Sequence, residues 1–363
     1  MMTDLSGFDA IQKRMTALWD RELIDRCCCA VFATGEEAER EFNSYPSDNE
    51  EENRKMLVEP EWMLRKHLDL FEHTYFAGDA FPLINLNLGP AGHTAFLKGV
   101  RPMYRNTSIW YSAPLEEDEE LYPEKIVFDP EAYLYRQTFA AAEYLVNEAN
   151  GRYMVSMPDV SGDIDVLGNI RTTMNLMIDL VSDEDAVHES LDKIQKIWRE
   201  FIPQIYEIVR KSCLGGSCIG WLHTWAPGLH SQMQADMSGM FSNELYEEFI
   251  RRELEEDCSV LEYPLYHFDG QEQIRHLDTL LSIENLKMIQ WTPVAGQPSP
   301  VKFIPQLKRI QSAGKCLHLI LKPNEVEPIM TELSSKGLFL LVNVRTKDEA
   351  DDMMKLVTKL TRE

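Results

Sequence analysis

The C-terminal part of the chain repeats one pattern four times: a short apolar run that ends in polar residues, followed by a segment with the spacing of an amphipathic helix. The four apolar runs cover residues 263–269, 286–292, 316–322 and 338–345. Strands that alternate with helices in this way are typical of parallel β–α–β units. The pattern predicts an α/β fold, a (β/α)8 TIM barrel over residues 81–363.

The N-terminal part has a different pattern. Residues 1–24 carry apolar side chains at helical spacing, and residues 34–80 are polar before becoming helical around 62–76. The short run at 27–32, which begins with three cysteines, is compatible with a strand because a free cysteine behaves as a small hydrophobe. We expect residues 1–80 to form an N-terminal helical extension packed on the barrel.

Composition narrows the function. The chain has 363 residues, of which 44% are apolar and 26% charged, and its formal charge is −24. Such an acidic surface repels polyphosphate, so nucleic acid is not an expected partner. There is no apolar run of membrane-spanning length and no signal-peptide pattern, which favours a cytoplasmic location. Seven cysteines, an odd number, argue against a disulfide framework. The oligomeric state stays open, with a homodimer among the alternatives.

The strand predicted at 263–269 ends in two residues able to do chemistry, His267 and Asp269. Residues two apart in a strand share a face, so both side chains should point into the mouth of the barrel. They are suited to an acid/base pair, or to binding zinc. In the alternative interpretation Asp269 only caps the next turn and His267 only makes a structural hydrogen bond.

Other polar and aromatic residues fall at predicted strand ends or in the loops after them. His223 closes the run at 217–225 and is a third candidate catalytic residue. Lys322 and Arg345 are the strong cations at the last two strand ends and are suited to an anionic group. The candidate substrate-binding residues are Asn85, Asn87, Trp225, Asp236, Gln290, Trp291, Lys322, Asn343 and Arg345.

Three stretches, at 236–256, 264–283 and 286–300, resemble the uroporphyrinogen decarboxylase superfamily. This superfamily includes the haem-pathway decarboxylase and cobalamin-dependent methyltransferases. The resemblance covers roughly residues 80–363. It implies a (β/α)8 barrel with its active site at the carboxyl ends of the strands.

Two departures from the superfamily pattern bear on activity. Decarboxylases carry an arginine-rich segment after the first strand, whereas this chain has the acidic TGEEAERE there. The methyltransferases bind zinc through a His-x-Cys pair and a cysteine near the last strand. This chain keeps the histidine as His267, has Asp269 in place of the first cysteine, and has Asn343 and Arg345 near the last strand. The thiol-activating zinc site is therefore incomplete.

The resemblance leads us to expect a corrinoid-dependent methyltransferase or demethylase for a small methoxy or methylamine substrate. The cobalamin would be carried by a partner corrinoid protein, with zinc at His267 and Asp269 as a further hypothesis. One alternative is a decarboxylase-like lyase that holds a smaller carboxylate with Lys322 and Arg345. A second is a non-catalytic barrel subunit.

Overall fold

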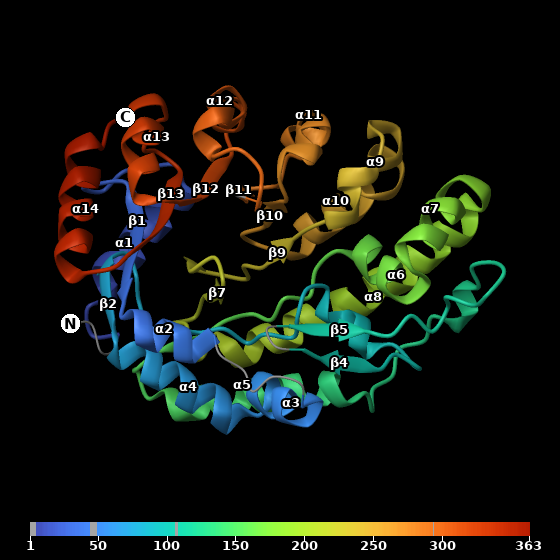
Figure 1. Cartoon of the computed structure of the whole chain (residues 1–363). Coiled ribbons are helices and arrows are strands. Elements are labelled where there is room, and N and C mark those ends of the chain that lie inside the picture. Colours follow the sequence, from blue (N-terminus) through green and yellow to red (C-terminus); the bar gives the residue numbers. More distant parts are fainter. Residues whose placement is uncertain (1–4, 44–48, 106–107, 293) are drawn as a thin grey trace.

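The computed structural model describes residues 5–43, 49–105, 108–292 and 294–363 of a mixed α/β chain (Figure 1). Its main element is a curved seven-stranded sheet in which every neighbouring pair is parallel except the first, β2 with β1. In spatial order the strands are β2 (Thr74–Gly78), β1 (Cys28–Thr34), β13 (Leu338–Val344), β12 (Cys316–Leu321), β11 (Met288–Trp291), β10 (Leu265–Phe268) and β9 (Gln232–Met233).

Three short two-stranded sheets accompany this sheet. They are the parallel pair β3 (Leu83–Ile84) with β6 (Met154–Val155), and the antiparallel pairs β4 (Pro102–Tyr104) with β5 (Ile109–Tyr111) and β7 (Ser217–Ile219) with β8 (Thr224–Ala226). A parallel bridge joins Met157 to Ile219. The α/β class is confirmed. Because no ladder of the described residues joins the ends of the main sheet to these pairs, a closed eight-stranded barrel is not shown.

Helices cover the sheet from several sides. Figure 1 shows α11–α14 along the outside of β10–β13, with α2–α4 and α5 on the opposite side of the molecule. Their bounds are α1 Phe8–Trp19, α2 Glu36–Asn43, α3 Glu50–Val58, α4 Pro60–Glu72, α5 Tyr133–Ala149, α6 Asp163–Arg171, α7 Thr173–Ser182, α8 Glu184–Val209, α9 Asn243–Phe249, α10 Arg251–Val260, α11 Leu277–Ser282, α12 Ile304–Ser312, α13 Val326–Glu332 and α14 Lys347–Leu360. Short 3-10 helices are η1 Gly92–Phe96, η2 Pro123–Lys125, η3 Asp236–Met240, η4 Gln271–His276, η5 Pro300–Phe303 and η6 Pro323–Glu325.

The strands separate two apolar cores by simple alternation. In β1, Cys29 and Val31 pack into the layer between sheet and helices, whereas Cys28 and Ala30 face the interior of the curved sheet. The other strands of the sheet alternate in the same way, because successive strand residues point to opposite faces. Helix α1 closes one end of the interior, where its Trp19 packs with the strand residues. The predicted strand at 27–32 is thus an interior strand of the main sheet, between β2 and β13.

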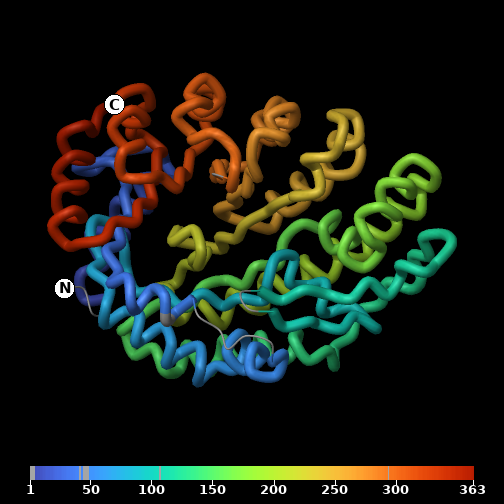
Figure 2. Tube along the Cα trace, in the orientation of Figure 1, coloured from blue at the N-terminus to red at the C-terminus, as the bar shows by residue number. Residues whose placement is uncertain are grey.

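Two differences from the sequence-based expectation concern chain organisation. The stretch 1–80 contributes β1 and β2 to the main sheet, and Figure 2 shows the blue and red ends of the chain side by side where β1 pairs with β13. The predicted strand at 217–225 is instead a tight hairpin, because residues 220–223 turn back and β8 pairs with β7. Among the helices of the described residues, none has the length and apolarity needed to cross a membrane.

Candidate functional site

Polar side chains gather at the carboxyl ends of three neighbouring parallel strands, β9, β10 and β11. His267 of β10 lies in register with Gln290 of β11, and both side chains belong to the face that points into the curved sheet. The carboxyl ends of parallel strands are the usual place for a site in α/β folds. The candidate site is built around His267.

The imidazole of His267 is held from one side. Its Nδ1 lies 2.6 Å from Oε1 of Gln290 and 3.0 Å from Oγ1 of Thr292. An amide oxygen accepts hydrogen bonds, so Nδ1 is the protonated nitrogen and Nε2 keeps its lone pair. Burial lowers the pKa of His267, and the Gln290 contact and the charge of Asp269 oppose this effect only in part. His267 is therefore a neutral base at pH 7.

Asp236 faces the free nitrogen of His267. Its Oδ1 lies 3.8 Å from Nε2 of His267, and 39% of its side chain is exposed. Burial of the carboxyl group, followed by the like charges of Asp165, Asp269 and Asp159, raises the pKa of Asp236 to about 9. An acid and a base that are both neutral at pH 7 thus lie side by side, which is the arrangement that proton transfer requires.

A chain of hydrogen bonds extends from Asp236 to an indole ring. Gln234 donates to Oδ2 of Asp236 at 3.4 Å, and Gln232 donates to Gln234 at 3.0 Å. Nε1 of Trp221 donates to Gln232 at 2.5 Å, and the Trp221 ring meets the His267 ring edge-on with centroids 5.1 Å apart. The β7–β8 turn therefore supplies one wall of the site.

Of the predicted residues, the structure brings His267, Gln290, Asp236 and Asp269 together. Asp269 influences the pKa of both His267 and Asp236 through its charge. The amide nitrogen of Gln290 is buried and has no hydrogen-bond partner among the described residues, so one donor is left beside the site. Asn85 lies close by, because a Cβ placed on Gly220 in the Trp221 turn would come within 2.3 Å of its side-chain oxygen.

Three predicted residues are packed in the protein interior instead. The β7–β8 hairpin determines this for two of them, and the alternation of side chains along β11 determines it for the third. His223 is held by the main chain, with Nε2 2.7 Å from the Phe81 oxygen, and burial lowers its pKa to about 4. Trp225 is 1% exposed, and its Nε1 donates to the Cys213 oxygen at 2.9 Å. Trp291 stacks on Phe268 in the sheet–helix core. These main-chain hydrogen bonds and ring contacts hold the three side chains within the packed interior.

The remaining predicted residues lie at other strand ends. Asn87 closes a turn by accepting from the Gly89 amide at 2.7 Å. Lys322 and Asn343 line a cavity of about 480 Å³ beside the loop 294–300. Arg345 has an 81% exposed side chain whose Nε lies 3.9 Å from Glu36.

The donor set does not fit zinc. In the part of the chain that the structure describes, no group of three or more His, Cys, Asp and Glu side chains is arranged to hold a metal ion. All seven cysteines are buried, and Nδ1 of His267 is already occupied by Gln290. We therefore assign no role to zinc in the chemistry of this site.

Sequence reasoning missed Trp221, Gln232, Gln234 and Asp165. A usable signal was present in SQMQAD, where Gln232, Gln234 and Asp236 alternate with apolar residues as strand residues do on one face. Trp221 could not be placed without the hairpin, and Asp165 comes from a distant helix.

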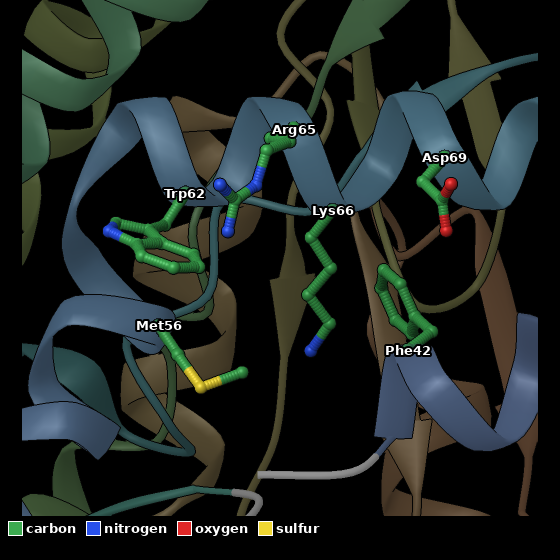
Figure 3. A pocket seen from close by; sticks show the side chains of 6 residues that line it. All are labelled: Phe42, Met56, Trp62, Arg65, Lys66 and Asp69. Carbon is green, nitrogen blue, oxygen red and sulfur yellow. The ribbon is translucent and has the colours of Figure 1, made fainter. Parts of the chain in front are cut away.

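A second hollow lies away from these candidates, on the N-terminal helices. Figure 3 shows side chains of α2, α3 and α4 around a cavity of about 270 Å³, lined by Phe42, Met56, Trp62, Arg65, Lys66 and Asp69. Burial lowers the pKa of Lys66 to about 8, and its Nζ lies 4.2 Å from the centre of the Phe42 ring. None of the residues predicted for the site lines this cavity.

Comparison with known proteins gives a likeness of fold. No protein-family model matches the chain, and no curated protein matches its sequence. A solved structure similar to this one is a methyltransferase from Methanosarcina mazei, with a TM-score of 0.60 and 12% sequence identity over 96% of this chain and 98% of that chain. At this identity the likeness extends to the fold and not to the activity.

Proposed function

We propose that this protein is a methyltransferase that takes the methyl group of a small methoxy or methylamine compound and passes it to a corrinoid carried by a partner protein. The observation that carries the proposal is the pair formed by Asp236 and His267. The fold shared with a methyltransferase of known structure is consistent with it.

In this reaction the protein must donate a proton to the leaving atom and must hold the substrate in the correct position. When the bond between the methyl carbon and the oxygen or nitrogen breaks, the leaving atom takes up an electron pair and needs a proton. Asp236 holds such a proton at neutral pH and has an exposed face, so it is the general acid. The lone pair of His267 Nε2 then serves the return of a proton to Asp236 from solvent.

The corrinoid, when its protein is docked, would supply the reduced cobalt that accepts the methyl group. The remaining residues position the substrate. Trp221 offers an apolar wall beside His267. Holding the substrate in line for displacement is a large part of catalysis in such a reaction.

The two alternative functions, a decarboxylase and a non-catalytic subunit, agree less well with these residues. A decarboxylase needs cations beside the substrate carboxylate, whereas the charges that act on Asp236 come from three other carboxyl groups. Lys322 and Arg345 lie at the ends of β12 and β13 and are exposed. A non-catalytic subunit gives no reason for an acid with a strongly raised pKa next to a histidine of fixed tautomer.

The experiment is an assay of methyl transfer. The protein is incubated with reduced cobalamin, free or bound to a corrinoid protein, and with methanol, methoxy compounds and methylamines in turn. Formation of methylcobalamin is followed by absorbance, and carbon dioxide release is measured in parallel with small carboxylates.

We expect methylcobalamin with one substrate class and its loss in Asp236→Asn. The matched control is Asp185→Asn on the exposed face of α8. Absence of methylcobalamin with every substrate and corrinoid protein would overturn the proposal. Carbon dioxide release that is lost in Arg345→Ala would favour the decarboxylase.

A further inference from the structure

Asp165, on the first turn of α6, binds the backbone at the start of η3, the short helix that begins with Asp236. One oxygen of its carboxylate accepts from the backbone N–H of Asp236 and the other from that of Met237, both at 2.9 Å. Asp165 itself is only 9% exposed. A buried carboxylate that accepts two successive backbone groups fixes both the position and the direction of that backbone.

The loop before α6 is shaped to admit this carboxylate. Gly162 has φ +81, and a Cβ at that position would lie 2.5 Å from Oδ2 of Asp165. Only glycine combines this conformation with the space that the carboxylate occupies. The chain therefore places Asp165 against η3 through a local constraint as well as through the two hydrogen bonds.

Asp165 also acts on Asp236 through charge. The groups that face Asp236 are Asp165 from α6, Asp159 after β6, Asp269 after β10 and His267 from β10, with Gln234 on its own segment. Asp165 is the foremost of the like charges that raise the pKa of Asp236.

The carboxyl groups of Asp165 and Asp236 differ in the hydrogen bonds that they accept. Burial raises the pKa of Asp165, and its two backbone hydrogen bonds and the Gln234 contact offset that rise only in part. Among the described residues, the carboxyl oxygens of Asp236 receive one side-chain donor, Gln234 at 3.4 Å. Hydrogen bonds stabilise the ionised form that accepts them, so the proton of this pair resides on Asp236.

We propose that Asp165 is a positioning residue, which holds the Asp236 carboxyl group against His267 and supplies the negative charge that favours the acid form of Asp236. The catalytic side of this inference rests on the proposed function. The electrostatic side does not, because it concerns the titration of Asp236 in the protein without substrate.

The test is a pH titration of the whole protein by carboxyl-carbon NMR, with aspartate labelled at Cγ and the Asp236 signal assigned by its absence in Asp236→Asn. In the unaltered protein the midpoint is expected near the pKa of about 9. In Asp165→Asn it falls toward the ordinary carboxylate range, whereas Asp165→Glu, which keeps the charge, retains a raised value.

Two further variants complete the design. Gly162→Ala should displace the Asp165 carboxylate and lower the midpoint in the same direction, and it decides the matter if Asp165→Asn does not fold. Asp257→Asn removes another buried carboxylate, one that accepts from Gln195 at 2.6 Å, and should leave the midpoint in place. An unchanged midpoint in Asp165→Asn and Gly162→Ala, or an equal shift in Asp257→Asn, would overturn the inference.

Activity adds a separate readout. If the protein transfers methyl groups, Asp165→Asn should lower kcat with little change in KM and should move the alkaline loss of activity to lower pH. If the unaltered protein transfers none, the proposed function fails, and the titration still decides the role of Asp165.

Discussion

Gln290 and His267 face each other from neighbouring parallel strands, with Oε1 of Gln290 2.6 Å from Nδ1 of His267. This contact fixes the tautomer of His267. Because Nδ1 carries the proton, the lone pair lies on Nε2, the nitrogen that faces Asp236. The strand register therefore determines which nitrogen can take part in proton transfer.

Gln290→Leu removes the amide acceptor and leaves Nδ1 of His267 beside the Thr292 hydroxyl, which can donate as well as accept, so the tautomer of His267 should be released. We expect kcat for methyl transfer to fall by roughly 10-fold or more, yet by less than the roughly 10²–10⁴-fold expected for loss of the base in His267→Ala. Nitrogen-15 NMR of the imidazole should show a single tautomer in the unaltered protein and a mixture in Gln290→Leu. Equal activity and an unchanged tautomer would contradict the proposed role of Gln290.

The pH dependence of the reaction should follow Asp236. The acid form is required and the pKa is raised to about 9, so kcat should be retained below that value and lost as the pH rises through about 9. In Asp236→Asn this alkaline limb should disappear, leaving a lower rate across the same range. A steady-state pH profile of both proteins measures this, and a limb that survives in Asp236→Asn would assign it to another group.

Much of the fold could be predicted from the sequence, because apolar runs followed by amphipathic segments depend on local pattern. The last four strands lie where these runs were found, and α1 occupies the middle half of the stretch 1–24. The hairpin at 217–226 was missed because SCIGWLHTWA has the composition of one continuous strand. The antiparallel pairing of β7 with β8, the positive φ of His223 and the close approach of Gly220 to Asn85 are features of the three-dimensional structure, and a local pattern does not contain them.

The site was predictable to the extent that it lies on single strands. His267 and Gln290 follow from strand phase, and Asp236 from its position just before the helix predicted to start near Phe241. The influence of Asp165 on Asp236 spans two elements about seventy positions apart in the sequence, and local patterns carry no information on such a contact. The aromatic residues Trp225 and Trp291 were given ligand roles because a pattern does not distinguish the two faces of a strand that are both apolar.

The two tryptophans of the hairpin should respond differently to substitution. Trp225 is 1% exposed and packs edge-on against Phe8, so Trp225→Ala should lower the free energy of unfolding by about 3–5 kcal/mol. Trp221 is partly exposed beside His267, so Trp221→Phe should reduce methyl transfer and change stability little. Urea unfolding and the methylcobalamin assay, run on both variants, separate the two roles. The opposite pattern would place Trp225 at the site.

A buried ion cluster at the other end of the sheet should contribute strongly to stability. Asp79 has a fully buried side chain that lies 2.7 Å from Nε of Arg14 and 2.6 Å from Nη1 of Arg26, and it accepts from the Cys29 amide at 2.8 Å. It thereby ties α1, β1 and the segment after β2 together. Removing one partner of a buried pair leaves the other charges without compensation, a loss of roughly 3–5 kcal/mol.

Asp79→Asn should therefore lower the midpoint of urea unfolding markedly and speed hydrogen exchange in α1, because Arg14 lies on that helix. The control is Asp352→Asn, which breaks an exposed pair with Lys355 and should leave the unfolding midpoint in place. Combining Asp79→Asn with Arg14→Gln should cost less than the sum of the two single changes, since both remove the same contact. Strict additivity in this cycle, with unchanged exchange in α1, would show that the cluster does not anchor the helix.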